Sequence, residues 1–153
     1  MKLYLVQHGK AKSKEEDLSR PLSQEGVNES EKIASHLEDI SLKVPRIYHS
    51  TKLRARQTAG IFAGHLKPRD GLEEREGLAP NDDPLIWKEC LRVENEDVML
   101  IGHLPHLSRL ASLLLCGNSD EEIVGFSNSA IVCLEKTGDN WLVRWMLTAQ
   151  LLV

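Results

Sequence analysis

The sequence predicts an α/β fold, a three-layer α/β/α sandwich whose central sheet is mainly parallel. Short apolar runs alternate with longer stretches of helical periodicity along most of the chain, and this alternation is typical of βαβ units. Several apolar runs are continuous, as in strands that helices cover on both faces. Because 153 residues suit one core, we expect a single domain over residues 1–153.

The first half of the chain contains two predicted strand–helix units. Residues 3–7 form a continuous apolar strand that ends at His8-Gly9, and a polar loop follows over residues 10–21. Ser23 suits the N-cap of the next helix, because its hydroxyl can accept from amide groups of the first turn. The remaining elements predicted here are a helix with apolar or small positions at Val27, Ile33, Ala34 and Leu37, a strand at 46–49, a helix at 53–66 and a short strand near 70–75.

The second half continues the alternation and then changes to a hairpin. Gly138-Asp139-Asn140 is a turn signal between two strands, and Gly117 is a plausible helix stop. The predicted elements are a loop at 77–84, a helix at 84–93, a strand at 98–101, a helix at 104–115 and strands near 130–134 and 141–146.

Composition excludes several classes of protein. A net charge of −4 argues against a nucleic-acid binder, for which a basic stripe is expected, although it leaves room for a local basic pocket. The N-terminal apolar run is too short for a signal peptide, and no stretch approaches the ~20 apolar residues of a membrane span. We therefore expect a cytoplasmic protein without membrane association. Cys90, Cys116 and Cys133 form no CxxC pair, so a structural zinc site is not expected.

Polar residues follow the predicted strands at corresponding places. His8 follows the first strand, Ser50 and Arg54 follow the second, and His103 follows the strand at 98–101. In open α/β sheets, ligands bind outside the carboxyl ends of the strands, so these side chains are expected to converge. Helix N-termini at the same edge add amide donors and a positive dipole end.

Two histidines and an arginine at one sheet edge indicate an anion site. The planar guanidinium matches phosphate oxygens and keeps its charge at any working pH. A neutral imidazole can attack phosphorus, and its ordinary pKa of about 6.5 leaves it neutral near pH 7. Gly9, directly after His8, lets the backbone approach a ligand closely.

Four segments resemble the histidine phosphatase superfamily, also called phosphoglycerate mutase-like. LVQHGKA at residues 5–11 resembles its LVRHGxA signature, and STKLRARQTA at 50–59 resembles its SPxxRAxQTA segment. IGHLPHLSRL at 101–110 is similar to the segment with the second catalytic histidine. RPLSQEG at 20–26, the short chain and the GHLP form are most similar to SixA-type phosphohistidine phosphatases. The resemblance implies a phosphoglycerate mutase-like fold.

The resemblance also implies roles for individual residues. His8 is the nucleophile that accepts the phosphoryl group, and Arg54 clamps the phosphate oxygens. His103 is a second donor that stabilises charge during transfer, and Arg20 is a further phosphate contact. Ser50 lies beside the pocket. A phosphohistidine intermediate requires no metal ion and no cofactor, so none is expected.

This chain departs from the family pattern at Gln7, where the signature has arginine. A glutamine amide donates hydrogen bonds but brings no charge, and charge-assisted bonds are roughly twice as strong. Phosphate affinity and rate are therefore expected to be lower than in relatives. Lys10 or Lys12 can restore the charge; alternatively, the site binds phosphate and turns over poorly.

The proton donor is less well defined by the sequence. Relatives that cleave phosphate esters use a Glu or Asp to protonate the leaving group. The candidates here are Asp82 and Asp83 in the PNDDP loop, followed by the carboxylates before it, Glu73, Glu74 and Glu76. A phosphohistidine substrate relaxes this requirement, because a protonated imidazole ring leaves as a neutral molecule.

The substrate predicted from these observations is phosphohistidine on a protein, such as a histidine-containing phosphotransfer domain. The short chain leaves little room for a lid, and an open site suits a protein side chain. Two alternatives remain: a phosphatase for a small phosphorylated metabolite, and a phosphate- or phosphoprotein-binding module with little turnover.

Overall fold

The computed structural model describes residues 1–153 and contains one six-stranded sheet. The strand order is β3-β2-β4-β1-β5-β6; the first four strands are parallel, while β5 and β6 run antiparallel to their neighbours. The predicted mixed α/β class with a mainly parallel sheet is thereby confirmed. The strands are β1 (Lys2–Gln7), β2 (Arg46–His49), β3 (Leu72–Glu74), β4 (Val98–Gly102), β5 (Ile131–Thr137) and β6 (Asn140–Leu147).

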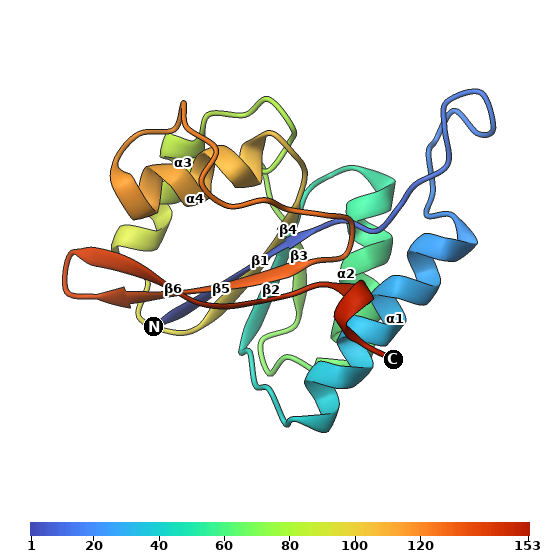
Figure 1. Cartoon of the computed structure of the whole chain (residues 1–153), viewed down its shortest axis with the longest axis horizontal. Coiled ribbons are helices and arrows are strands. Elements are labelled where there is room, and N and C mark those ends of the chain that lie inside the picture. The colour runs from blue at the N-terminus through green and yellow to red at the C-terminus, as the bar shows by residue number, and fades with distance from the viewer.

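Helices cover both faces of the sheet (Figure 1). Helices α1 and α2 lie on one face and α3 and α4 on the other, each pair over its own apolar cluster. Strand β1 serves both clusters, because Tyr4 and Val6 point to one side and Leu3 and Leu5 to the other. This explains its continuous apolar run. The helices are α1 (Gln24–Asp39), α2 (Leu53–Leu66), α3 (Pro84–Arg92), α4 (His106–Cys116) and the short 3-10 helix η1 (Ala149–Leu151).

The helix ends follow local chemistry. Ser23 caps α1 as predicted, since its side chain accepts a hydrogen bond from the Gly26 amide. Gly117 ends α4 in the left-handed conformation. The predicted start of α4 at residue 104 is wrong, because the helix begins at His106. Leu104 precedes a proline, and this placement disfavours helical backbone. None of the helices is both long and apolar enough to cross a bilayer.

Strand register determines which residues meet at the carboxyl edge of the sheet. Gln7 at the end of β1 pairs with Gly102 at the end of β4, so the next residues, His8 and His103, leave the sheet side by side. His49 at the end of β2 pairs with Ile101 of β4. Ser50 therefore emerges on the other side of His103, and three segments far apart in sequence converge.

Residues 11–22 form a projection that we call the arm. An antiparallel bridge between Ala11 and Leu22 closes its base, and the Lys12 amide donates to the Pro21 carbonyl at 2.8 Å. In Figure 1 the arm stands out from the body beyond the N-terminal end of α1. The sequence predicts this segment only as a polar loop.

Candidate active site

The two histidines that follow β1 and β4 form an imidazole pair. Their ring centroids lie 4.9 Å apart, and the His8 amide donates to the Gly102 carbonyl at 3.0 Å. His103 is 1% exposed, whereas His8 is only partly buried. The sheet register thus delivers one accessible imidazole and one enclosed imidazole to the same place.

The tautomer of His8 follows from its hydrogen bond. Its Nδ1 lies 2.7 Å from the Gly9 carbonyl oxygen, and because a carbonyl can only accept, Nδ1 carries the proton. Nε2 therefore keeps a free lone pair. Burial lowers the pKa of His8 to about 4, and the charges of Arg54 and Arg20 act in the same direction, against the Gly9 bond. The ring is accordingly neutral and nucleophilic near pH 7.

A hydroxyl orients His103. Ser50 Oγ lies 2.6 Å from His103 Nε2 and accepts from the Lys52 amide at 3.1 Å. The Ser50 hydroxyl keeps a second lone pair, so it can accept from Nε2 or donate to it; where it donates, the His103 proton resides on Nδ1. Nδ1 is buried without a protein partner. Burial, and then the charge of His8, lower the pKa of His103 to about 3. In the tautomer protonated at Nδ1, the neutral ring can donate to an oxyanion.

Two guanidiniums lie near the imidazole pair. Arg54 and Arg20 line the same cavity, and burial, and then the charge of Arg20, lower the pKa of Arg54. Arg54 Nε is buried without a hydrogen-bond partner, as expected of a donor whose acceptor is a bound anion. Arg20 adopts a left-handed backbone conformation, with φ of 47°, and its Nε donates to the Lys12 carbonyl at 3.0 Å. Strain of this kind in a residue other than glycine concentrates at functional sites.

A cavity of about 530 Å³ is lined by Arg20 and Arg54 and extends toward the arm. Four cations line it against the single carboxylate of Asp82, in a chain whose net charge is −4. The lysines involved are Lys14 and Lys52. The prediction that Lys10 or Lys12 restores the missing charge is not supported, since Lys10 pairs with Glu25 at 2.6 Å and Lys12 is outside the lining. The cavity is a local basic region suited to an anionic ligand.

Gln7 and Gly9 flank the nucleophile in different ways. Gln7 Oε1 is buried without a hydrogen-bond partner, so this side chain adds an amide dipole where the family signature has a charge. At Gly9 a Cβ would lie 2.7 Å from Ser30 Oγ and 2.9 Å from the Gly26 carbonyl. The structure therefore gives a different reason for glycine than ligand access, namely close packing against α1.

The two aspartates proposed as proton donors have different environments. Asp82 lines the cavity, and its Oδ2 accepts from the Ala79 amide at 2.9 Å. Asp83 is the N-cap of α3 and accepts from the Leu85 amide at 2.9 Å. Asp83 is thus engaged in holding a helix, and only Asp82 faces the cavity. The other candidates, Glu73, Glu74 and Glu76, are outside the cavity lining.

Sequence reasoning did not identify the residues that support the nucleophile loop. The Gly9 amide donates to Thr58 Oγ1 at 2.9 Å, and Thr58 Oγ1 donates to the Arg54 carbonyl at 2.8 Å. Asn128 Nδ2 donates to the His8 carbonyl at 3.1 Å. Thr58 belongs to the RAxQTA segment, so a sequence motif marks it. Asn128 lies in a loop that no motif marks. Together they fix the nucleophile relative to α2.

Two further histidines, His49 and His106, lie next to motif residues in the sequence, and both are buried rather than exposed at the rim of the site. His49 is 4% exposed, with Nδ1 donating to the Ser50 carbonyl at 2.9 Å. His106 is fully buried, and neither ring nitrogen has a partner. His49 is the last residue of β2, within the sheet, and His106 is the first residue of α4, which packs on it.

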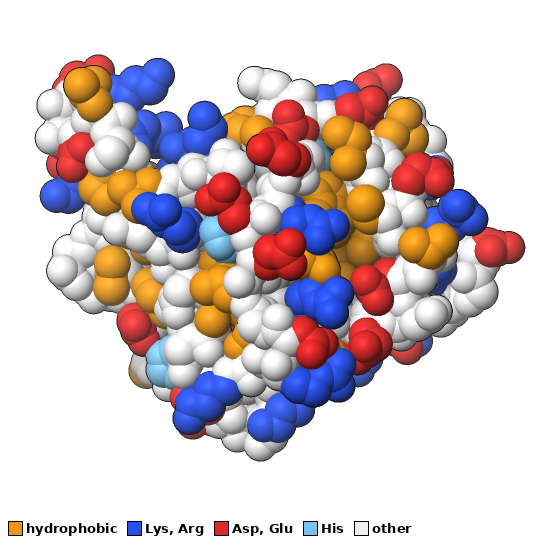
Figure 2. All heavy atoms as spheres, turned by 180° about the vertical axis from the view of Figure 1, so that it is seen from behind, with side chains coloured by type: hydrophobic (Ala, Val, Ile, Leu, Met, Phe, Trp, Pro, Cys, Tyr) orange, Lys and Arg blue, Asp and Glu red, His pale blue; other side chains and the backbone are white.

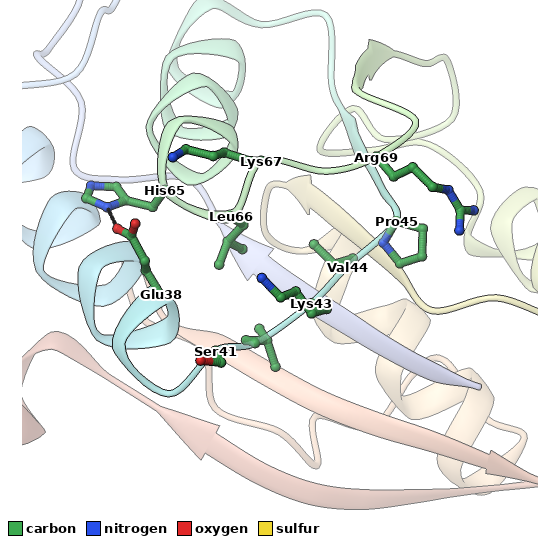
Figure 3. A pocket seen from close by; sticks show the side chains of 10 residues that line it. Glu38, Ser41, Lys43, Val44, Pro45, His65, Leu66, Lys67 and Arg69 are labelled. Carbon is green, nitrogen blue, oxygen red and sulfur yellow. Dashed lines mark hydrogen bonds and ion pairs between the residues drawn. The ribbon is translucent and has the colours of Figure 1, made fainter.

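A second cavity of about 330 Å³ lies between the C-terminal ends of α1 and α2 (Figure 3). Its lining includes Val44 and Pro45, just before β2, so it is at the opposite end of that strand from Ser50. Lys43, Lys67 and Arg69 line it. Because helix C-termini carry partial negative charge, these cations complement the helix dipoles. The imidazole pair is outside the lining of the first cavity, but that cavity contains Arg54 and Arg20, whose charges act on the pKa of His8. The first cavity, together with the imidazole pair, is therefore the candidate active site.

The fold and this arrangement of histidines and arginines define a phosphatase of the phosphoglycerate mutase-like type. The profile of the histidine phosphatase superfamily (branch 1) matches residues 3–79. Phosphohistidine phosphatase SixA of Escherichia coli K12 is 30% identical over 155 residues, covering 97% of this chain and 94% of the relative. The chain belongs to the histidine phosphatase superfamily, and this kinship supports a phosphatase, that is, a hydrolase.

Within the superfamily the chain is similar to SixA proteins. A solved structure of the protein histidine phosphatase SixA in complex with tungstate superposes with a TM-score of 0.86 at 26% identity, covering 98% of each chain. An uncharacterized protein of Picosynechococcus sp. PCC 7002 is 32% identical over 131 residues, covering 80% of this chain and 78% of that protein.

Proposed function

We propose that this chain hydrolyses phosphohistidine on proteins through a covalent phospho-His8 intermediate. The observation that carries the proposal is the hydrogen bond from His8 Nδ1 to the Gly9 carbonyl, which leaves Nε2 free beside a second imidazole and two guanidiniums. A neutral nucleophile surrounded by donors for the phosphoryl oxygens is what phosphoryl transfer requires.

The proposed reaction exchanges one nitrogen–phosphorus bond for another. His8 Nε2 attacks phosphorus, the bond to the substrate nitrogen breaks, and the substrate imidazole leaves neutral because its other nitrogen is protonated. Water then attacks phospho-His8, and inorganic phosphate and neutral His8 are released. Arg54, Arg20 and the Nδ1 proton of His103 are assigned to the phosphoryl oxygens. No step requires a metal ion or cofactor.

The acidic residues favour this substrate over an alkyl phosphate. An alkoxide needs an acid to protonate it as it leaves; Asp83 caps α3, so Asp82 is the single carboxylate of the cavity that could serve. A neutral imidazole leaves without such help. The similarity to a SixA protein that binds tungstate also supports a tetrahedral oxyanion at this site, since tungstate has the shape and charge of phosphate.

The test is chemical trapping of the intermediate. A histidine-phosphorylated phosphotransfer domain carrying radioactive phosphate is mixed with the enzyme and quenched after milliseconds to seconds. We expect acid-labile, base-stable label on the wild type and none on His8→Ala, with His36→Ala, on α1, as the matched control that retains it. Turnover is expected to be unchanged in EDTA.

The same assay separates the alternatives. Faster hydrolysis of sugar phosphates than of the phosphorylated domain would indicate a metabolite phosphatase. Phosphate binding without label or turnover would indicate a binding module, the outcome that Gln7 makes worth testing. Label that persists in His8→Ala would refute the assignment of the nucleophile.

A further inference from the structure

The arm at residues 11–22 is held in shape by its own hydrogen bonds. At the base, the Leu22 amide donates to Gln57 Oε1 at 2.8 Å, which ties the arm to α2. Toward the tip, the Asp17 amide donates to the Ser13 carbonyl at 3.0 Å, and the Arg20 amide donates to the Asp17 carbonyl at 3.0 Å. The arm is therefore a preorganised projection whose side chains have defined positions.

Leu18 is held near the tip of this projection with 88% of its surface exposed, more than any other large apolar side chain except the C-terminal Val153. A single exposed leucine is ordinary on a protein surface, so exposure alone assigns it no role. Leu18 differs because it also lines the cavity that contains Arg20 and Arg54. Burial of an apolar side chain by a partner is favourable, and a preorganised apolar side chain at a cavity can serve as a binding anchor.

Two basic side chains of the arm line the cavity, and its acidic side chains do not. Lys14 and Arg20 line the cavity, whereas the acidic run at residues 15–17 does not. Across the cavity, α2 begins with Lys52 at its N-cap and Leu53 in its first turn. Figure 2 shows blue Lys and Arg side chains gathered where the arm joins the body, with hydrophobic side chains on the arm itself. The cavity is thus walled by cations and leucines.

None of these cations is neutralised within the chain. Lys14, Arg20, Lys52 and Arg54 make no ion pair, although Lys10 at the arm's base does so with Glu25. Arg20 and Arg54 are assigned to the phosphoryl group. Lys14, Leu18 and Lys52 line the same cavity and are not assigned to the phosphoryl group, so they are free to contact the molecule that carries it. Unpaired positive charge there complements a partner with carboxylates.

We propose that the cavity-facing side of the arm, centred on Leu18 and Lys14, is the docking surface for the folded protein that carries the phosphohistidine. This inference rests on the proposed function and names the chemistry of its partner. That partner presents an apolar side chain to Leu18 and carboxylates to Lys14 and Lys52, around its phosphorylated histidine. The docking surface selects a protein substrate without contacting the reacting phosphorus.

The experiment compares kcat/KM for two substrates, phosphoramidate and a folded, histidine-phosphorylated phosphotransfer domain. Leu18→Ser is expected to lower kcat/KM on the domain by about fivefold or more, chiefly through KM, and to leave phosphoramidate turnover within about twofold. Leu151→Ser is the matched control, since Leu151 is 69% exposed and lies outside the cavity lining.

The outcomes separate the docking surface from the proposed function. Equal effects of Leu18→Ser and Leu151→Ser on the domain would overturn the docking surface and leave the phosphatase intact. If Leu18→Ser lowered kcat/KM on phosphoramidate as much as on the domain, the docking surface would also be overturned, because the arm would then shape the phosphate site itself. A wild type that hydrolyses phosphoramidate but not the domain would refute the proposed function and, with it, the partner.

Discussion

Gln7 is the residue at which this site differs most from its family. It stands beside the nucleophile, and its Oε1 is buried without a partner, so no charge reaches the phosphoryl group from this position. We predict that Gln7→Arg raises kcat/KM on phosphoramidate by about fivefold, because a charge-assisted hydrogen bond adds on the order of 1 kcal/mol over a neutral one. Steady-state kinetics at constant ionic strength measure the effect.

The control for this substitution is Gln7→Met, which keeps the length of the side chain and removes the amide. It is expected to lower kcat/KM if the glutamine donates to the phosphoryl group. A Gln7→Arg enzyme that is folded and no faster than the wild type would mean that charge at this position does not limit catalysis.

At this scale the sequence predicted the place of each reactive side chain better than its hydrogen bonds. His8, Ser50 and His103 follow strand ends, and the register of β1, β2 and β4 brings such positions together. The proton on His8 Nδ1 depends on the carbonyl of Gly9, a contact made by the backbone path after the strand. Asp83 looked like an acid because a helix cap and a catalytic carboxylate have the same sequence signature.

At the scale of elements, an imidazole joins the two helices on one face of the sheet. His65 near the end of α2 lies between two glutamates of α1, with Nε2 2.6 Å from Glu31 and Nδ1 2.6 Å from Glu38. These hydrogen bonds, Glu31 first and Glu38 second, raise the pKa of His65. The protonated ring therefore contributes stability below pH 6.5 that is lost as the pH rises through its folded pKa.

We predict that His65→Gln lowers the free energy of unfolding at pH 6 by about 1 kcal/mol, the upper range for partly exposed ion pairs. The deficit shrinks as the pH rises through the raised pKa of His65, because the wild-type imidazole then loses its proton. Urea denaturation at pH 6 and at a series of higher pH values measures this difference, with His36→Gln on α1 as the matched control. A deficit that is independent of pH would assign His65 a packing role instead.

Most elements were predictable because each has a local signal, and the exceptions lack one. Ser23 and Gly117 mark helix ends by their own chemistry. The start of α4 was misplaced because apolar periodicity continues through Leu104 while the proline that follows excludes it from the helix. The arm has no apolar periodicity at all. Its shape comes from turns and from the Gln57 side chain of another element, which composition does not reveal.

At the scale of the molecule, the same burial that creates the site makes the fold sensitive to acid. Burial is the main cause that lowers the pKa of His8 to about 4, of His103 to about 3 and of His106 to about 4. In the unfolded chain each ring takes up a proton near pH 6.5. The unfolded state therefore binds more protons below that value, and stability is lost as the pH falls from about 6.5 toward 4.

Substitution of His106 tests this loss of stability at low pH without changing a residue that takes part in the proposed reaction. Its ring is fully buried in α4, neither nitrogen has a partner, and no step of the proposed mechanism uses it. We predict that His106→Leu flattens the fall in stability between pH 6.5 and pH 5. The variant is also expected to be at least as stable as the wild type at pH 7, because two buried nitrogens without hydrogen bonds cost free energy that a leucine does not. Urea denaturation of both proteins from pH 5 to pH 8 measures the two slopes, and parallel curves would place the acid sensitivity in the catalytic pair alone.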